Sequence, residues 1–517
     1  MFRKLLSPRH PADKNQNPNS KVDVNSSLPL DVDQAITEVQ SAMGNSSDLQ
    51  VHRFQAFTGD TGCALVYLKS FVDLEQLNKS VLSPLLQLAV PPKDMQNLAE
   101  VLPYAGTQEI TSLQELSQAV ASGEVVLLVS GFKSGLKIPL KKYEQRSITE
   151  PQNEKLVSGP RDCFVESIWS NIGLLRQRIK NPKLRIEMNT LGTKTSVELG
   201  IVYVEGIANR QIVEEVRRRL KRIEIDRLLS LGVINEFISD SPWSPFPTYQ
   251  HTERPDSLTS ALLDGRVGIL LDGSSMVTII PVVFWDFLKS PDDYIESPYF
   301  STFVRLLRLS SHLMTLLLPG AYVALTTFHL EMLPQSLAVI ISGSRTRTPF
   351  PTAIEMIIME LVVEILREAG LRMPGVFGQT MSIVGALVIG EAGVTAGLVE
   401  PIIVVIVAFT TLSSFIVPNY SAALSIRLLR FPIILLSAAL GFFGMILGAM
   451  FFLMHLVSLR SFGVPYFAPI APLFLKDLGD MFIRLPLWLQ THRPTYYRPE
   501  DETKAGRNQK PGPEKEP

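Results

Sequence analysis

The stretch from Pro349 to Gly370 constrains the fold most, because it is too charged to face lipid and too apolar to be exposed to water. It reads PFPTAIEMIIMELVVEILREAG and contains no Pro or Gly between Pro351 and Gly370. Thr352 and Glu355 have the spacing of a capping box, and Gly370 stands where a C-terminal cap is expected. These signals predict one helix over the whole stretch.

This predicted helix carries an acidic stripe. At 100° per residue, Glu360, Glu364, Arg367 and Glu368 fall within about a third of the circumference, while most large apolar side chains lie elsewhere. A carboxylate in the middle of a membrane costs on the order of 3 kcal/mol, so three glutamates facing lipid would cost roughly 9 kcal/mol. We therefore expect them to line a water-filled path, to lie at the membrane interface, or to pair with Arg367 and neighbouring basic groups.

Composition separates the chain into two halves. Charged residues make up 19% of the 517 residues and concentrate in the first half, whereas long apolar runs dominate after Leu309. This predicts an α+β soluble half followed by an α-helical membrane domain with several spans. A net charge of -1 gives no field that would favour nucleic acid. Two cysteines cannot form a disulfide framework, and the N-terminus MFRKLLSPRH lacks a signal-peptide core, so we expect the first half in a reducing cytosol.

Periodicity and turn residues suggest six segments. The expected order is a disordered tail at 1–30, a first cytoplasmic α/β subdomain at 31–150, a second at 151–245, a linker with a helix and hairpin unit at 246–300, a transmembrane domain at 301–490 and a disordered tail at 491–517. In the second subdomain the basic run EEVRRRLKR predicts either a solvated helix face with Glu–Arg pairs or a contact with anionic lipid or a partner.

An internal repeat is visible in the first 300 residues. SGEVVLLVSGFKSGLKIPL and DGRVGILLDGSSMVTIIPV align without a gap, with Gly123 opposite Gly265 and Gly131 opposite Gly273. We interpret them as two copies of a helix and hairpin unit, and the alternative is chance similarity of two apolar hairpins. If the repeat is real, residues 267–283 form sheet and not a membrane span, despite their hydropathy.

Four apolar stretches in the second half are candidates for membrane crossings. They are Leu309–Phe328, Ile383–Val399, Ile402–Val417 and Phe431–Leu459. The first reaches about 30 Å as a helix, which is enough to cross the hydrocarbon layer. Glu391 and Glu400 lie in or beside the second stretch. His312 and His329 are interpreted as packing or interface residues, because no Cys, His or carboxylate lies nearby at the spacing of a metal site.

Several motifs occur in the order that a known family has. They are GPRDCFVESIWSNIGLLRQRI, SPWSPFPTYQHTERPD, DGRVGILLDGS, SPDDY, FHLEMLPQSLAV, RTPFPTAIEMIIMELVVEILREAGLRMP, RFPIILLSAALGFFGMILG and SFGVPYFAPIAP. From about Lys155 to Pro486 the chain resembles the A subunit of GerA-type spore germinant receptors. The resemblance implies a multi-pass protein of the inner spore membrane that works with a transporter-like, nutrient-binding B subunit and a lipoprotein C subunit. It also implies a ring, expected to be a pentamer, that releases monovalent cations to start germination.

The acidic helix is the candidate site. We hypothesise that it lines the ion path, with glutamates attracting cations and an apolar residue such as Met359, Leu361 or Val363 forming the gate. The predicted pathway residues are Glu355, Met359, Glu360, Val363 and Glu364, with Glu391 and Glu400 as secondary candidates that can equally be structural. No catalytic triad, paired acid and base, metal site or cofactor motif is recognisable. The alternatives are a non-conducting scaffold that assembles the receptor and a secondary transporter with inverted repeats.

Overall fold

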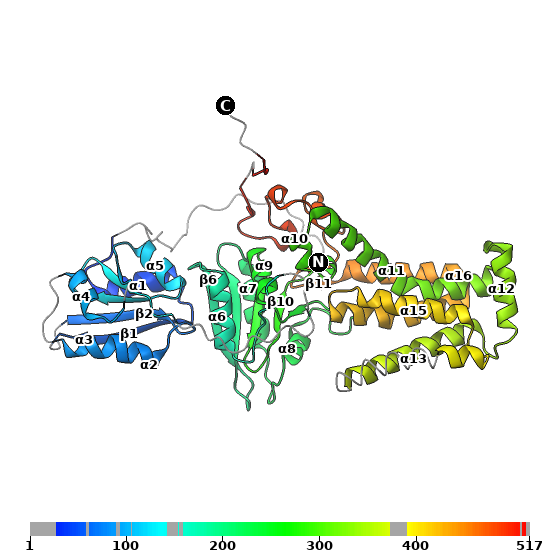
Figure 1. Ribbon diagram of the computed structural model, residues 1–517, viewed down its shortest axis with the longest axis horizontal. Coiled ribbons are helices and arrows are strands. Elements are labelled where there is room, and N and C mark those ends of the chain that lie inside the picture. Colours follow the sequence, from blue (N-terminus) through cyan, green and yellow to red (C-terminus); the bar gives the residue numbers. More distant parts are fainter. Residues whose placement is uncertain are drawn as a thin grey trace. The chain divides into compact units, whose positions relative to one another are not determined.

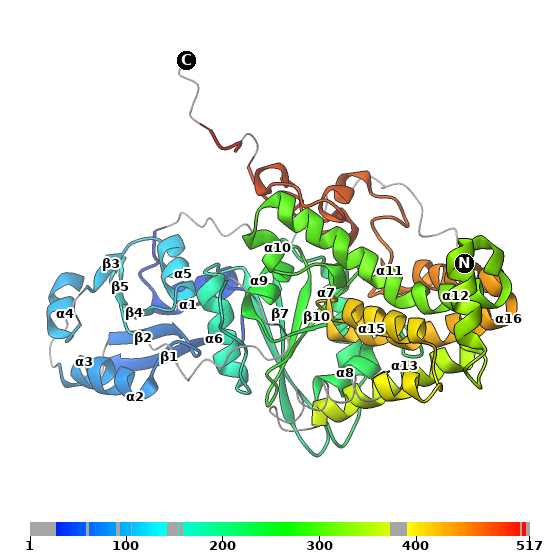
Figure 2. The ribbon, with the colours of Figure 1, turned by 45° about the vertical axis from the view of Figure 1, so that its right-hand side comes forward.

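A computed structural model describes residues 27–57, 61–88, 94–104, 106–141, 154, 159–372, 390–506 and 509–512 (Figures 1 and 2). The chain divides into two compact units, Met1–Glu144 with Ile179–Arg185, and Gln145–Arg178 with Ile186–Pro517. Residues 1–26 of the tail predicted at 1–30 and residues 383–389 of the span predicted at Ile383–Val399 lie outside the described residues. The tail prediction is wrong for its last residues, because Leu28 is buried in the core of the first unit.

The first unit is a five-stranded sheet between two layers of helices. Its strands, in the order β1-β2-β4-β5-β3, are β1 (Leu49–Ala56), β2 (Thr61–Leu68), β4 (Val125–Val129), β5 (Gly135–Ile138) and β3 (Gln108–Ile110), and neighbours are antiparallel. The helices are α1 (Val32–Ala42) and α5 (Leu113–Ala121) on one face, and α2 (Leu74–Leu77), the π-helical η1 (Asn78–Leu82), α3 (Ser83–Gln87) and α4 (Met95–Val101) on the other. Side chains of β2 alternate between the two cores, with Leu65 facing one and Val66 the other.

The second α/β domain has a sheet of the same order, β6-β7-β9-β10-β8. The strands are β6 (Leu184–Leu191), β7 (Val197–Val204), β9 (Val267–Leu271), β10 (Val277–Ile280) and β8 (Gln250–Thr252), and the helices are α6 (Ile168–Arg178), α7 (Arg210–Lys221), α8 (Leu231–Ile238) and α9 (Pro255–Leu263). α7 and α8 share one core with the sheet. On the opposite face Gly268 lets α9 approach closely, since a Cβ there would lie 2.8 Å from Leu258.

The predicted repeat is confirmed, and it is larger than the sequence indicated. Hairpins β4–β5 and β9–β10 correspond, and the strand order around them is the same in both sheets. Residues 267–280 are sheet, as expected. The boundary predicted at residue 245 is wrong, because β8, β9 and β10 complete the second sheet and do not form a separate linker. An isolated hairpin could not bury its apolar faces, which explains why it joins the preceding strands.

The rest of the second unit contains a bundle of long helices (Figure 1). They are α11 (Pro298–Phe328), α12 (Gln335–Arg345), α13 (Thr352–Arg372), α15 (Pro401–Phe415) and α16 (Tyr420–Ser458), and the short α10 (Asp292–Ile295) precedes them. Among the described residues, α11 and α16 are long and apolar enough to cross a membrane. α15 is apolar but shorter.

α16 reverses direction at Gly441, whose φ of 64° is left-handed. A Cβ on Gly448 would lie 2.9 Å from Ile433, and Ser425 and His455 both contact the loop at 244–245, so the two arms are antiparallel. The single span predicted at Phe431–Leu459 is therefore wrong in extent, because glycine permits a sharp turn inside an apolar run. We call the end of the bundle with Ser425 and His455 the domain end, and the end with Gly441 the far end.

The chain after α16 returns to the second α/β domain. Residues 460–506 form a strap with the short strands β11 (Arg460–Ser461) and β12 (Val464–Pro465) and the 3-10 turns η4 (Leu475–Asp480), η5 (Leu487–Leu489) and η6 (Thr495–Tyr497). Tyr496 and Tyr497 are buried, and the backbone N–H of Glu500 donates to the carbonyl of Ile207 at 2.9 Å. The disordered tail predicted from residue 491 is thus wrong for 491–506, because these aromatic side chains fill the core.

Candidate functional site: two charge clusters on α13

The acidic stretch forms α13, as predicted, and the helix continues to Arg372, two residues beyond the predicted cap. The predicted capping box is wrong. The first-turn N–H groups of Ile354 and Glu355 donate to the carbonyl of Pro351. The Glu355 carboxylate instead accepts from the backbone N–H of Glu400 at 2.9 Å. A partner on α15 therefore replaces the local bond that sequence spacing indicated.

The first charge cluster joins α13 to both α15 and α16. We call it the Arg430 cluster, and it consists of Glu360, Glu364, Arg367, Arg427 and Arg430. Arg430 Nη1 lies 2.7 Å from Glu360 Oε2 and its Nη2 lies 3.8 Å from Glu364 Oε2. Arg427 Nη1 approaches Glu364 at 3.1 Å, and Arg367 Nη1 does so at 3.5 Å. Two acids are therefore matched by three arginines.

Burial differs sharply within the Arg430 cluster. The side chains of Glu360 and Arg430 are 0% exposed, whereas the side chain of Glu364 is 37% exposed. Glu360 also accepts a hydrogen bond from the Thr410 hydroxyl on α15 at 3.3 Å. Removing one member of a buried ion pair typically costs about 3–5 kcal/mol, because a charge is then left without a partner. The Glu360–Arg430 pair therefore fixes α13 against α16.

The second charge cluster lies toward the far end. We call it the Glu400 cluster, and it consists of Tyr322, Arg345, Glu355 and Glu400. The Tyr322 hydroxyl donates to Glu400 Oε2 at 2.8 Å, and Arg345 Nε lies 3.8 Å from Glu400 Oε1. Glu355 and Glu400 are both buried. The cluster connects α11, α12, α13 and the residue before α15, so Glu400 has its partners within one chain.

The predicted pathway residues fall into two groups. Glu355, Met359 and Glu360 face the interior of the chain, where Met359 belongs to an apolar core with α11 and α15. Val363 and Glu364 are half-buried at its edge. The outward face of α13 carries exposed apolar side chains, namely Ile354, Ile358, Leu361 and Ile365. Of the three possibilities for the acids, pairing with arginines is the one that the structure shows.

The secondary candidates and the histidines lie apart from the Arg430 cluster. Glu391 is helical and exposed. His312 is buried and its Nδ1 lies 2.9 Å from the carbonyl of Arg308. His329 stacks on Phe442, with ring centroids 5.2 Å apart. Both histidines therefore pack as expected.

Sequence reasoning missed the arginines that pair with the acids. Arg427 and Arg430 were not singled out, although two arginines three positions apart at the start of an apolar run share one face of a helix. The free-energy cost of a charge facing lipid applies to these arginines as it does to the glutamates. Acidic and basic side chains within apolar helices are best stabilised by pairing with one another, so the sequence could have predicted this pairing.

Other motifs have structural roles in the described part of the chain. In α7, Glu215 pairs with both Arg218 and Arg219, and the Arg218 side chain is 70% exposed, which supports the interpretation of a solvated face with Glu–Arg pairs. Arg219 is largely buried and also lies 2.6 Å from Asp240. Burial raises the pKa of Cys63 to about 11, so this thiol is not a nucleophile at neutral pH. Among the described residues, no group of three or more His, Cys, Asp and Glu side chains could hold a metal ion.

Two tandem α/β domains and a bundle that contains two helices of spanning length indicate membrane association of a protein with a large soluble part. A family model described as "Bacillus/Clostridium GerA spore germination protein" matches residues 37–496. Spore germination protein KA of Bacillus subtilis is 39% identical over 92% of this chain and 89% of its own length. Spore germination protein GerLA of Bacillus cereus is 37% identical over 91% of this chain and 96% of its own length. The chain belongs to the GerA family of spore germination proteins.

A solved structure also matches. It is the crystal structure of the N-terminal domain of the A subunit of the Bacillus megaterium spore germinant receptor GerK3, 28% identical, with a TM-score of 0.41. The match covers 50% of this chain and 98% of that chain.

Proposed function

We propose that the chain is the A subunit of a nutrient-responsive germinant receptor and that copies of it form a ring, of five subunits, that conducts monovalent cations across the inner spore membrane. The observation that carries this proposal is the two-sided character of α13. Its buried side is fixed by Arg430, and its outward side exposes Ile354, Ile358, Leu361 and Ile365. In a ring, outward stripes from several copies would surround the axis.

The ion path of this proposal runs along the exposed edge of α13. Glu364 is the acid in the Arg430 cluster whose side chain is substantially exposed, so it is the acid that would face the path, with three arginines within 3.8 Å offsetting its charge. Leu361, one turn away and 47% exposed, would form the apolar constriction. Val363 borders the path beside Glu364, while Glu355, Met359 and Glu360 hold the helix in place. Hydrophobic constrictions gate by excluding water, and acidic rings favour cations.

The experiment is cation flux through proteoliposomes that contain the purified receptor. Leu361→Ser should raise flux in the absence of nutrient, because a polar side chain wets the constriction. Glu364→Gln should lower the preference for cations over anions. Glu296→Gln, an exposed acid between α10 and α11, is the matched control and should change neither quantity. Unchanged flux and selectivity in both test variants would remove α13 from the path.

The soluble part and the partners follow from the same proposal. The two α/β domains lie in the cytoplasm, and a transporter-like B subunit that binds the nutrient and a lipoprotein C subunit complete the receptor. Co-purification of the three subunits from spore membranes tests this assembly. Recovery of the chain without either partner would contradict it.

A non-conducting scaffold is the second candidate, and one observation favours it. Glu355, Glu360 and Glu364 all have partners within one chain, so their charges alone do not require a wet path. Single-channel recording separates the two candidates, because a scaffold gives no unitary currents under any nutrient condition. Saturable exchange of a substrate, without unitary currents, would instead indicate a secondary transporter.

A further inference from the structure

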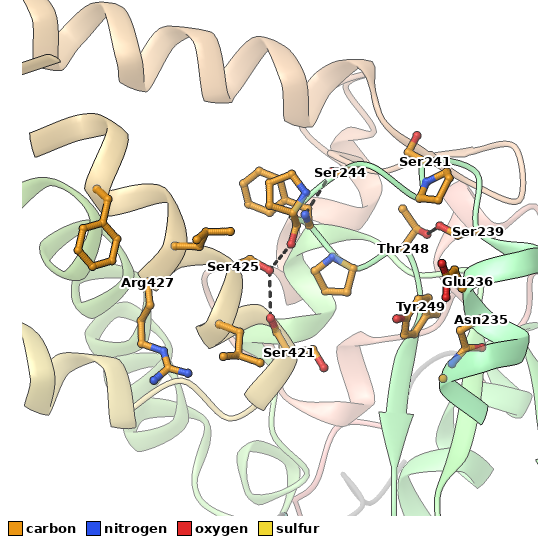
Figure 3. Close-up of a pocket in the computed structure, with 18 of the residues that line it drawn as sticks. Asn235, Glu236, Ser239, Ser241, Ser244, Thr248, Tyr249, Ser421, Ser425 and Arg427 are labelled. Atoms are coloured by element: carbon orange, nitrogen blue, oxygen red, sulfur yellow. Dashed lines mark hydrogen bonds between the residues drawn. The ribbon is translucent and has the colours of Figure 1, made fainter. Parts of the chain in front are cut away.

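A cavity of about 630 Å³ lies at the domain end of the helical bundle, where the loop 239–249 faces the first turns of α16 (Figure 3). This volume suits a small molecule or a lipid headgroup. Its polar wall carries hydroxyl groups from Ser239, Ser241, Ser244, Thr248, Ser421 and Ser425. Its other wall is apolar and consists of Leu424, Leu428 and Phe431. The cavity is therefore amphipathic.

The α8 side of the cavity offers hydrogen-bond acceptors. Asn235 is 0% exposed, and its Nδ2 lies 3.2 Å from His251 Nε2 and 3.1 Å from Thr278 Oγ1. Its Oδ1 lacks a partner among the described residues, although buried polar atoms rarely lack one. The exposed carboxylate of Glu236 is the next residue along and also lines the cavity. An acceptor and a negative charge thus meet on this side.

The α16 side offers a donor with positive charge, beside the Glu364 carboxylate, which also lines the cavity. Arg427 is 4% exposed, its Nη1 lies 3.1 Å from Glu364, and its Nε lacks a partner among the described residues. Figure 3 shows Arg427 and the pair Asn235 and Glu236 on opposite sides of the cavity. A ligand that satisfies both sides carries a cationic hydrogen-bond donor at one end and an anionic acceptor at the other.

The cavity also opens where apolar helix surface begins. The first arm of α16 exposes Leu424, Leu428 and Leu435, and the first two of these line the cavity. Trp243, 98% exposed, lies between the lining residues Pro242 and Ser244. Indole side chains prefer the membrane–water interface, so this loop is placed for contact with lipid headgroups.

The loop that carries Trp243 is held rigidly. Ser425 Oγ donates to the carbonyl of Pro245 at 2.5 Å, and Ser244 Oγ lies 2.9 Å from His455 Nε2. Both arms of α16 therefore fix the loop. A rigid, exposed indole beside an amphipathic cavity needs no rearrangement before a lipid binds.

We propose that this cavity binds the headgroup of a phospholipid with a primary ammonium group. The ammonium lies at Asn235 and Glu236, the phosphate lies at Arg427 and the hydroxyl groups, and the acyl chains follow Leu424 and Leu428. A quaternary ammonium cannot donate to Asn235 Oδ1, and a headgroup without a cation leaves Glu236 unmatched. The inference rests on the membrane location proposed above.

Native mass spectrometry of the full chain in nanodiscs tests this selectivity. The probes are phosphatidylcholine alone and its mixtures with phosphatidylethanolamine or phosphatidylglycerol. Phosphatidylethanolamine should be retained in preference to the other two. Glu236→Gln and Arg427→Lys should each lower its retention about tenfold, the value of one charge-assisted hydrogen bond. Glu214→Gln, an exposed acid on α7, is the matched control and should retain lipid as the parent does.

Further measurements distinguish this proposal from its alternatives. Equal retention of the three lipids, preference for phosphatidylglycerol, or unchanged retention in Glu236→Gln overturns the proposal. Soluble phosphoethanolamine that binds as tightly as the lipid would assign the cavity to a free solute and overturn the lipid part. Brominated phosphatidylethanolamine should quench Trp243 in a variant whose other tryptophans are replaced by Phe, and lack of quenching contradicts the placement of the loop. Vesicle flotation checks insertion independently, so a failure of the membrane proposal is recognised as such.

Discussion

The two α/β domains share one topology but use it differently. Each has a five-stranded sheet of corresponding order with helices on both faces. The first closes both of its cores with its own helices, α1 and α5 on one side and α2 to α4 on the other. In the second, the core under α7 and α8 continues into α16 and the strap at 460–506. A duplicated fold therefore served once as a self-contained domain and once as the base of the helical bundle.

The residues that precede β4 and β9, Glu124 and Arg266, illustrate this difference between the two domains. Glu124 precedes β4 and pairs with Lys137 and Lys141 at 3.4 Å, near the surface. Arg266 takes the same place before β9, where it is buried, donates to the carbonyl of Pro281 at 2.8 Å and lies 3.6 Å from Asp286. A charge has become buried in the second copy where the strap covers it.

The largest expected effect comes from removing Asp286. Asp286→Ala leaves Arg266 buried without its counter-charge and also removes the acceptor for the Tyr497 hydroxyl, so we expect a loss of about 3–5 kcal/mol. Glu124→Ala should cost about 1 kcal/mol or less, because its lysine partners are closer to solvent. Hydrogen exchange of β9 and β4 peptides in the full chain measures both free energies. Similar losses in the two domains would break the comparison.

A pH effect should be confined to the second domain. His251 on β8 is packed between Asn235 and Thr278, beside Tyr249, and burial lowers its pKa to about 4, whereas the corresponding Glu109 on β3 is exposed. The His251 imidazole binds a proton more tightly in the unfolded chain than in the folded one. The contribution of His251 to the free energy of unfolding is therefore highest above the unfolded pKa of about 6.5, and it decreases as pH falls toward 4. The loss amounts to about 3 kcal/mol.

The measurement for this pH effect is the difference in stability between the parent and His251→Gln at pH 7 and pH 4. Glu154, which accepts from the Thr252 hydroxyl on the same strand, acts in the opposite sense, because burial raises its pKa to about 6. Its contribution is lost as pH rises, and it cancels in the difference between the two proteins. A difference that does not depend on pH would show that His251 titrates normally.

Much of the fold could be predicted from local patterns. The gapless alignment around Gly123 and Gly265 is a local signal, and the structure confirms the two hairpins that it predicted. β6 was not predicted, although apolar and polar side chains alternate over residues 184–189, which is the pattern of a half-buried strand. Residues 491–506 of the strap were predicted to be disordered, since their polar and Pro-rich composition does not show that two tyrosines fill a distant core.

The candidate site was predicted only in part. The cost of charge in an apolar environment indicated that Glu360 and Glu364 do not face lipid, and pairing with basic groups was one of the three arrangements it allowed. Which partners they have depends on the packing of α13 against α16, and residues about 70 positions apart give no local signal of contact. The reversal at Gly441 is equally invisible, because glycines in apolar helices more often mark close packing.

A smaller effect should separate two glycines within each hairpin unit. Gly123 has a φ of +84°, and a Cβ there would lie 2.7 Å from the Phe71 ring, whereas Gly131, at +92°, faces open space. Gly131→Ala should cost about 1 kcal/mol for the left-handed backbone, and Gly123→Ala about 2 kcal/mol because a clash is added. Urea denaturation of the full chain, followed by exchange of β4 peptides, measures both.

The second copy offers a matched control for this glycine prediction. A Cβ on Gly265 would meet Pro499 of the strap at 3.2 Å and the carbonyl oxygen of Ile207 at 3.3 Å, while Gly273 faces open space. Gly265→Ala should therefore lower the free energy of unfolding more than Gly273→Ala does. The difference between the two variants should become smaller when the strap detaches from the domain. An equal loss of stability at all four positions would mean that the left-handed backbone conformation alone, and not the contacts of the added Cβ, determines the effect.

The smallest expected effect concerns an ion pair on the first strand of each sheet. Arg53 on β1 pairs with Asp33 at 3.0 Å, and both side chains are more than half exposed, so Arg53→Met should cost less than about 0.5 kcal/mol. Arg217 contacts Glu187 on β6 through two nitrogens and also bonds the Tyr203 hydroxyl, so Arg217→Met should cost about 1 kcal/mol. Repeating both measurements in 1 M salt separates the contributions, because screening removes the effect at Arg53 first. If the Arg53 variant lost more stability than the Arg217 variant, exposure would not be what ranks charged pairs in the two domains.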